Sequence, residues 1–140
     1  AYILTFMTTT LAIIMDPIES IKSYKDSSFA MLLASQEKKW QNVYFKATNL
    51  FIEDGKAFGY GQSIIVTDNT TDYFLLDEQK KYHLGDFSTI LMRKDPPFDM
   101  NYIYTTYILD LAKKAGAFIA NDPQSLRNYN EKITISLFPE

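Results

Sequence analysis

The stretch STILMRKDPPFD, residues 88–99, passes from a short apolar run into a loop with two cations, two carboxylates and two prolines. The run at residues 88–92 is typical of a buried strand. Each proline fixes its own φ angle, removes a backbone donor and keeps the preceding residue out of the helical region. We therefore predict a stiff loop that holds Arg93, Lys94 and Asp95 at a strand end, where open α/β sheets bind ligands. A polar loop that caps the next helix is an equally good interpretation.

Two further apolar runs resemble the run at residues 88–92. Residues 11–15 and 117–120 are continuously apolar, as expected for strands of a parallel sheet that is buried on both faces. Proline follows each of them within three residues and ends the strand. Residues 42–46 are predicted to form another strand. These four segments predict an α/β sheet that is mainly parallel.

Two helices are predicted between these strands. The first follows an N-cap at Asp26, and its core side chains are predicted to be Phe29, Leu32, Leu33 and Trp40. The second follows Asp99 and is predicted to stop at Gly116, after two lysines that suit the helix dipole. The apolar stripe predicted to pack on the sheet comprises Ile103, Tyr104, Tyr107, Ile108, Leu111 and Ala112.

The middle of the chain has an antiparallel pattern instead. Residues 50–53 and 56–60 flank Asp54-Gly55, a strong signal for a hairpin. Residues 63–67 and 73–76 continue the β character, with a turn predicted between them at residues 68–72. The glycines beside Tyr60 indicate strand or turn geometry. We predict an antiparallel β-hairpin excursion from the parallel sheet.

Composition excludes several kinds of function. The 140 residues suit one domain, and a net charge of −3 favours neither nucleic acid nor an anionic membrane as a partner. The absence of cysteine excludes disulfides and thiol catalysis and suits a reducing compartment. The single histidine, His83, cannot build a histidine metal site, and we predict that it lies on the surface. No apolar run is long enough to span a bilayer.

Three loops are predicted to meet at one edge of the sheet: residues 16–28, 93–99 and 121–127. The first offers free N–H groups at a helix N-terminus, the second offers cations, and the third offers amide and hydroxyl groups. Together they suit a small, polar, carboxylate-rich ligand. The sequence shows no serine–histidine pair, no metal cluster and no glycine-rich phosphate loop, so nothing indicates hydrolysis.

Several long motifs resemble those of bacterial glutathione synthetases in order and spacing. They are MDPI at residues 15–18, KDSSFAMLL at 25–33, ILMRKDPPFD at 90–99, NDPQSLR at 121–127 and NEK at 130–132. The resemblance is to the N-terminal domain of that family and covers nearly the whole chain from Met7 onward. It implies a Rossmann-like, three-layer α/β/α pre-ATP-grasp domain over residues 7–129. Residues 1–6 would then be an extension or a cloning remnant, and residues 130–140 the start of a connection to an ATP-grasp module.

The resemblance also implies a reaction. Family members join γ-glutamylcysteine to glycine with ATP and Mg²⁺, through an acyl phosphate, and their catalysis depends on positioning and charge stabilisation. Lys132 matches a family lysine that contacts ATP phosphates. The chain ends where the family's ATP-grasp module begins, so it would hold no catalytic residue and no metal ligand and would be inactive alone. The full-length enzyme is expected to be cytoplasmic and homo-oligomeric, without a nucleic-acid or membrane partner.

The resemblance and the loop chemistry together suggest substrate-binding roles. Arg93 and Lys94 are predicted to bind substrate carboxylates, with Arg93 in a bidentate fork, while Asp95 holds Arg93 or accepts from the substrate ammonium group. A second anionic group is assigned to Ser27 and Ser28. The remaining candidates are Asp16, which would orient the loop of Lys25, and Asn121, Gln124 and Ser125, for which capping the following helix is an equal alternative.

Two alternative functions remain open from the sequence. The first is a related ATP-grasp ligase that acts on a different peptide or carboxylate. The second is a non-catalytic binding or oligomerisation module, in which tyrosines line a protein interface. The tyrosines concerned are Tyr102, Tyr104, Tyr107 and Tyr129, and they are explained equally by helix packing or by a surface that faces the missing module.

Overall fold

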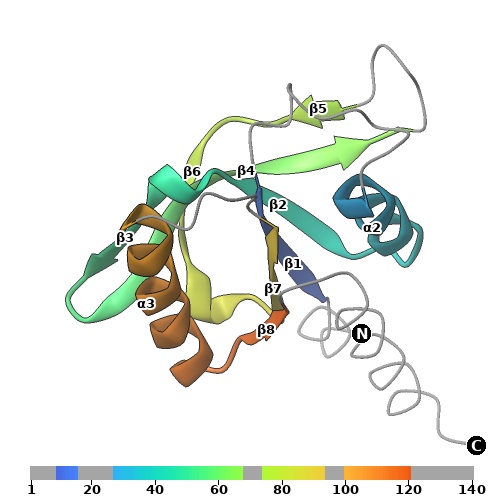
Figure 1. Cartoon of the computed structure of the whole chain (residues 1–140). Helices are drawn as coiled ribbons and strands as arrows, with labels where there is room; N and C mark the ends of the chain where they lie inside the picture. Colours follow the sequence, from blue (N-terminus) through green and yellow to red (C-terminus); the bar gives the residue numbers. More distant parts are fainter. Residues whose placement is uncertain (1–8, 16–26, 68–73, 94–99, 121–140) are drawn as a thin grey trace, which may run out of the picture.

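One mixed sheet of eight strands runs through the described part of the chain, with a helix on each face (Figure 1). The structure is a computed structural model that describes residues 9–15, 27–67, 74–93 and 100–120. The strand order is β3-β4-β2-β1-β7-β8, and β5 and β6 also pair with β4. The elements are β1 (Thr10–Met15), α2 (Ser27–Glu37), β2 (Gln41–Phe45), η2 (Ala47–Asn49), β3 (Leu50–Glu53), β4 (Lys56–Val66), β5 (Phe74–Leu76), β6 (Lys80–His83), η3 (Leu84–Asp86), β7 (Thr89–Arg93), α3 (Met100–Lys114) and β8 (Phe118–Ala120).

The predicted parallel sheet is confirmed in the four strands β2, β1, β7 and β8. All three pairings among them are parallel, and β1 lies between β2 and β7. Leu11 to Met15 are all buried, which agrees with a strand that is covered on both faces. Continuous apolar runs therefore identified the central strands correctly.

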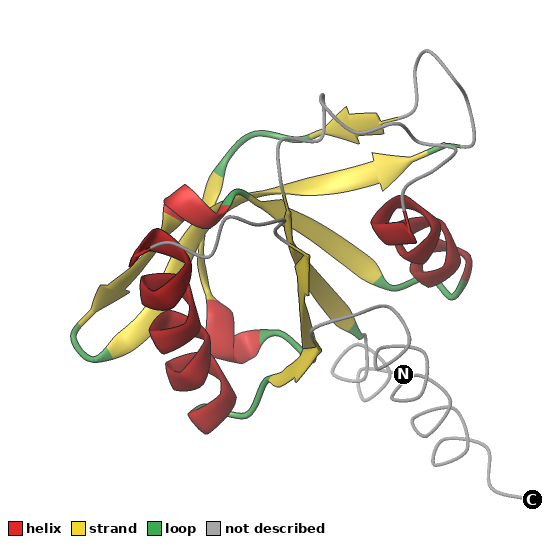
Figure 2. Cartoon of the chain, viewed as in Figure 1, coloured by secondary structure: helices red, strands yellow, loops and turns green. Residues whose placement is uncertain are grey.

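Two separate hydrophobic cores lie on opposite faces of this sheet, as the three-layer prediction requires. The helices α2 and α3 lie on either side of the sheet (Figure 2). In β1, Ala12 and Ile14 belong to the core that contains α3, and Leu11 and Ile13 belong to the core that contains α2. We call these the α3-side core and the α2-side core. The alternation follows from the two-residue period of a strand.

A hydrogen-bonded pair of polar side chains sits inside the α2 face. Asn42 and Ser35 are almost fully buried; Ser35 Oγ lies 2.9 Å from Asn42 Oδ1, and Asn42 Nδ2 donates to the Leu32 carbonyl at 3.3 Å. The pair joins the last turns of α2 to the start of β2. Buried polar groups without partners are costly, so each residue depends on the other.

Asn42→Ala is expected to lower the free energy of unfolding by about 1–3 kcal/mol, because it leaves Ser35 Oγ with one partner fewer in a buried site. Urea denaturation monitored by circular dichroism measures the change. Thr48→Ala, which truncates an exposed side chain, is the matched control and is expected to stay within about 0.5 kcal/mol of the wild type. Equal losses in both variants would contradict a specific role for the pair.

The hairpin prediction is confirmed, but the antiparallel part is larger than predicted. Asp54 and Gly55 have φ angles of +52° and +73°, the positive values that a type I′ turn requires. Residues 56–60 and 63–67, both predicted to have β structure, belong to one strand, β4, which pairs with β3, β6, β2 and β5 along its length.

Two glycines explain how β4 continues through that region. A Cβ at Gly59 would lie 2.8 Å from Leu50 Cδ2, and a Cβ at Gly61 would lie 2.6 Å from Phe45 Cε1. The Phe45 ring therefore rests directly on the backbone of β4. Glycine is needed here for close packing within a strand, not for a turn.

The buried face of α3 differs from the predicted stripe. Ile108 and Ala112 are buried as predicted and Leu111 is partly buried, but Ile103, Tyr104 and Tyr107 are 42%, 50% and 63% exposed. The face turned to the sheet comprises Thr105, Ile108, Leu109 and Ala112, at the helical spacing i, i+3, i+4 and i+7. The sequence carries two overlapping stripes, and tyrosine tolerates exposure because its hydroxyl stays in water.

The predicted end of α3 is confirmed. Gly116 has a φ angle of +120°, its N–H donates to the Lys113 carbonyl, and the Ala117 N–H donates to the Ala112 carbonyl. These two bonds form a Schellman motif, which favours glycine at the left-handed position. The cap turns the chain directly into β8.

Candidate functional site

The carboxyl ends of three parallel strands meet at one edge of the sheet, which we call the carboxyl edge. β1 ends at Met15, β7 ends at Arg93, and these two residues are Cα partners in the register of the sheet. β8 ends at Ala120, the partner of Leu91. The three predicted loops therefore begin at neighbouring positions, which is where ligands bind in open α/β sheets.

The predicted site residues themselves fall almost entirely outside the described residues. Ser27 and Ser28 are the first two residues of α2, and Arg93 is the last residue of β7. Their roles, and the convergence of their side chains on a ligand, stay predictions. The site residues outside the described part are Asp16, Lys25, Lys94, Asp95, Asn121, Gln124, Ser125 and Lys132.

Directly beneath the carboxyl edge the described strands are apolar. Met15, Met92 and Ala120 are 3%, 6% and 1% exposed, and Leu91 is fully buried. These residues give the edge a rigid apolar floor, because they belong to the two packed cores. Charged groups for a polar ligand must therefore come from Arg93, at the end of β7, and from the loops that follow these strands.

The described residues hold no group of three or more His, Asp or Glu side chains that could bind a metal ion. Within the same residues, no helix has both the length and the apolar character needed to cross a membrane.

An aromatic ladder covers the outer face of the antiparallel strands. The rings of Phe51 and Phe58 stack at 5.8 Å, those of Phe51 and Tyr60 at 5.2 Å, and the Lys81 ammonium lies 4.6 Å from the centre of Phe58. Lys81 also forms an ion pair with Glu53, and this hydrogen bond raises the pKa of Lys81. These contacts join neighbouring strands, so we interpret the aromatic ladder as a feature that stabilises the sheet.

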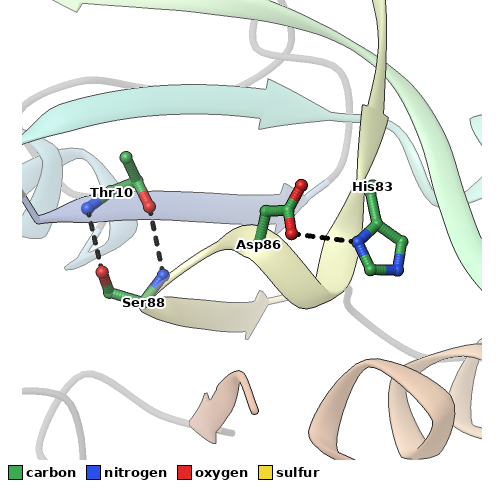
Figure 3. A network of polar contacts seen from close by, with 4 residues as sticks. All are labelled: Thr10, His83, Asp86 and Ser88. Carbon is green, nitrogen blue, oxygen red and sulfur yellow. Dashed lines mark hydrogen bonds and ion pairs between the residues drawn. The ribbon is translucent and has the colours of Figure 1, made fainter. Parts of the chain in front are cut away.

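His83, which is predicted to lie on the surface, has a side chain that is 27% exposed. Its Nδ1 lies 3.1 Å from Asp86 Oδ1 (Figure 3), and its ring is 5.3 Å from that of Phe58. A Cβ at Gly85 would come within 2.9 Å of the ring, so the backbone of η3 presses against it. The imidazole is held from two sides.

A polar pocket of about 280 Å³ lies beside His83, at the opposite edge from the predicted substrate site. We call that edge, where β1 and β2 begin, the amino edge. The residues that line the polar pocket are Thr10, Gln41, Val43, Ser63, Lys80, Tyr82, His83, Asp86 and Phe87. Sequence reasoning missed the polar pocket because its lining residues come from β1, β2, β4, β6 and η3, and no short sequence motif contains them.

The amino-acid sequence matches a family of known proteins over most of its length. Residues 9–127 match the family model for the prokaryotic glutathione synthetase N-terminal domain. The chain belongs to the prokaryotic glutathione synthetase family. The match spans every residue that the structure describes.

Individual glutathione synthetases show the same relationship. The protein of Buchnera aphidicola subsp. Baizongia pistaciae is 44% identical over 135 residues, which cover 96% of this chain and 42% of that protein. The protein of Pseudomonas syringae pv. tomato is 45% identical over 134 residues, with 96% and 42% covered, and that of Shewanella oneidensis is 46% identical over 130 residues, with 93% and 41% covered. The chain thus spans about two fifths of the length of these curated relatives.

Proposed function

We propose that this chain is the substrate-binding N-terminal domain of an ATP-dependent glutathione synthetase and that γ-glutamylcysteine binds at its carboxyl edge. The match to the family's N-terminal domain over residues 9–127 supports the assignment. The observation that carries the location is the pairing of Met15 with Arg93, which brings the loops after β1 and β7 to adjacent positions. An arginine at such an edge can bind a carboxylate through two parallel hydrogen bonds.

The proposed reaction makes a peptide bond between the cysteinyl carboxylate of γ-glutamylcysteine and the amine of glycine. ATP supplies the phosphoryl group that activates the carboxylate, and the glycine amine then displaces phosphate. In this proposal Arg93, Lys94 and the amides of Ser27 and Ser28 hold the anionic groups of the peptide in place. Such positioning accounts for much of the rate enhancement in reactions without a side-chain nucleophile.

The rest of the reaction belongs to a longer polypeptide in this proposal. Residues 7–129 form the domain, and residues 130–140 lead into an ATP-grasp module that holds most of the ATP and Mg²⁺ contacts. Lys132 would reach the ATP phosphates from this chain, and residues 1–6 lie outside the domain. The chain alone is then expected to bind the peptide without turning it over, and the full-length enzyme to be a homo-oligomer.

Titration of γ-glutamylcysteine into the ¹⁵N-labelled chain is expected to shift amide signals at the carboxyl edge. Met15, Met92 and Ala120 are the described reporters, because each stands at or next to the end of its strand. Amides at the tip of the β3–β4 hairpin, such as that of Gly55, serve as internal controls and should not move. ATP with Mg²⁺, added separately, should cause little change at these three reporters. A peptide response confined to the amino edge, or none at all, would contradict a preformed peptide site.

A further inference from the structure

The polar pocket lies on the side of the sheet that α3 covers, at the point where that cover ends. Thr10 continues the row of Ala12 and Ile14 in β1, and Gln41 continues the row of Val43 and Phe45 in β2; the apolar members of both rows belong to the α3-side core. On β4, Gly61 is buried but Ser63, two residues further on the same face, is exposed. The pocket is therefore an open extension of a packed core.

The floor of the polar pocket is apolar and firmly held. Val43 and Phe87 are 4% and 6% exposed and belong to the α3-side core. The Tyr82 ring packs on Phe45 and Phe87 with ring centres 5.8 Å and 5.7 Å apart. A floor of interlocked aromatic rings is formed before any ligand arrives, which lowers the entropic cost of binding.

One wall of the polar pocket is fixed by hydrogen bonds across the sheet. The Thr10 N–H donates to Ser88 Oγ at 3.3 Å, and the Ser88 N–H donates to Thr10 Oγ1 at 3.1 Å (Figure 3). This reciprocal pair ties the start of β1 to the residue before β7. Asp86 in η3 holds His83 at 3.1 Å, so that the histidine also has a defined orientation.

The rim of the polar pocket carries one cation and several neutral side chains that can donate hydrogen bonds. Within the described part of the chain, Lys80 makes no ion pair. The side-chain amide of Gln41 and the hydroxyls of Ser63 and Tyr82 make no hydrogen bond there. Asp86 is the lining carboxylate, and one of its oxygens already bonds His83. An ammonium group beside neutral side chains that can each donate a hydrogen bond, around a preformed hollow, complements a negatively charged group.

We propose that the polar pocket is a second ligand site, which binds a small anion through a carboxylate or phosphate group. Lys80 supplies the charge, and Gln41, Ser63 and Tyr82 supply neutral hydrogen bonds. The site lies at the amino edge, so its occupant does not compete for the position proposed for γ-glutamylcysteine. Because the chain has a net charge of −3, attraction comes from these local groups and not from the overall charge.

The test is a titration of the ¹⁵N-labelled 140-residue chain with inorganic phosphate and, separately, with succinate, at constant ionic strength set with sodium chloride. Saturable shifts at Gln41, Ser63 and Lys80 are expected for at least one of the two anions. Saturation by phosphate alone assigns the site to phosphate groups, saturation by succinate alone assigns it to carboxylates, and saturation by both assigns it to either anion. Only a linear drift at high concentration would overturn the proposal.

Two lysine variants separate a built site from general attraction of anions. Lys80→Gln removes the proposed ligand cation and is expected to raise the Kd about tenfold. Lys56→Gln removes another exposed lysine of the same sheet, with the same change in net charge, and is expected to keep the Kd within about twofold. Equal weakening in both variants would overturn the proposal. An otherwise unchanged amide spectrum of each variant shows that the fold is retained.

The outcome is independent of the proposed function. Loss of the anion site would leave peptide-induced shifts at Met15 and Ala120 intact. Failure of the peptide to shift those amides would leave the anion response at Lys80 intact. The two titrations therefore distinguish failure of one proposal from failure of the other.

Discussion

Phe45→Ala is expected to lower the free energy of unfolding by about 3–5 kcal/mol, because it empties a central site of the α3-side core. The Phe45 ring is fully buried, and it meets Tyr82 and Phe87 edge to face, at 5.8 Å in both cases. Urea denaturation measures the loss. Phe51→Ala, which truncates a half-buried ring of the outer aromatic ladder, is the control and is expected to cost about 1–2 kcal/mol. Similar losses in both variants would contradict the central place of Phe45.

The contact between Phe45 and the backbone of β4 can be tested by a double-mutant cycle. Gly61→Ala is expected to cost about 1–3 kcal/mol alone, because its new Cβ would lie 2.6 Å from Phe45 Cε1. In a Phe45→Leu background the ring atom is gone, so the same substitution should cost clearly less. Ser63→Ala, also on β4 but exposed, should show no coupling to Phe45. Additive losses for Gly61→Ala and Phe45→Leu would refute the packing explanation.

Under the proposed function, Arg93→Ala in the full-length enzyme is expected to raise the KM for γ-glutamylcysteine more than about tenfold. Losing a charged hydrogen-bond partner typically costs about 1.5–3 kcal/mol, which corresponds to that change. Steady-state ADP release at saturating ATP and glycine measures it. Arg93→Lys should give an intermediate KM, because lysine keeps the charge but lacks the bidentate fork.

An unchanged KM in a folded Arg93→Ala variant would remove Arg93 from the substrate site. The same assay tests the reaction itself. If the unmodified enzyme accepts other peptides or carboxylates better than γ-glutamylcysteine, the related-ligase alternative is favoured. Lys114→Ala, which removes an exposed cation from the last turn of α3, should leave the KM unchanged.

The elements that sequence reasoning identified correctly are those with a strong local cause. Strands buried on both faces have no polar positions, so residues 11–15 and 88–92 are recognisable without a partner strand. The turn at Asp54-Gly55 and the cap at Gly116 follow from positive φ angles that glycine and aspartate tolerate. Each of these features depends on a few neighbouring residues.

The features that were missed depend on residues far apart in the chain. Gly61 was predicted only to mark strand or turn geometry. No residue near it in the sequence reveals that the Phe45 ring packs against it. The buried face of α3 is chosen by the sheet, which takes Thr105 and leaves Tyr107 in water. The polar pocket draws Thr10, Gln41 and Lys80 from three strands, and no sequence spacing encodes that meeting.

The site roles have a different basis from the fold. The motifs around Arg93 and Ser27 indicated the family, and the family is confirmed over residues 9–127. The register places the end of β7 beside the end of β1, as parallel strands require. The roles of Arg93 and Ser27 toward a substrate stay predictions. The γ-glutamylcysteine titration and the Arg93→Ala kinetics test them directly.

The place of β1 in the sheet also determines when the domain can fold during synthesis. Thr10 bonds to Ser88, 78 residues later in the chain, so β1 has only β2 as a neighbour until β7 has been made. The β3–β4 hairpin, by contrast, closes between adjacent segments. Long-range parallel pairing is slow compared with local hairpin closure. As the chain leaves the ribosome, the antiparallel half is therefore expected to form first. Until β7 has been made, the apolar surface of β1 stays partly exposed.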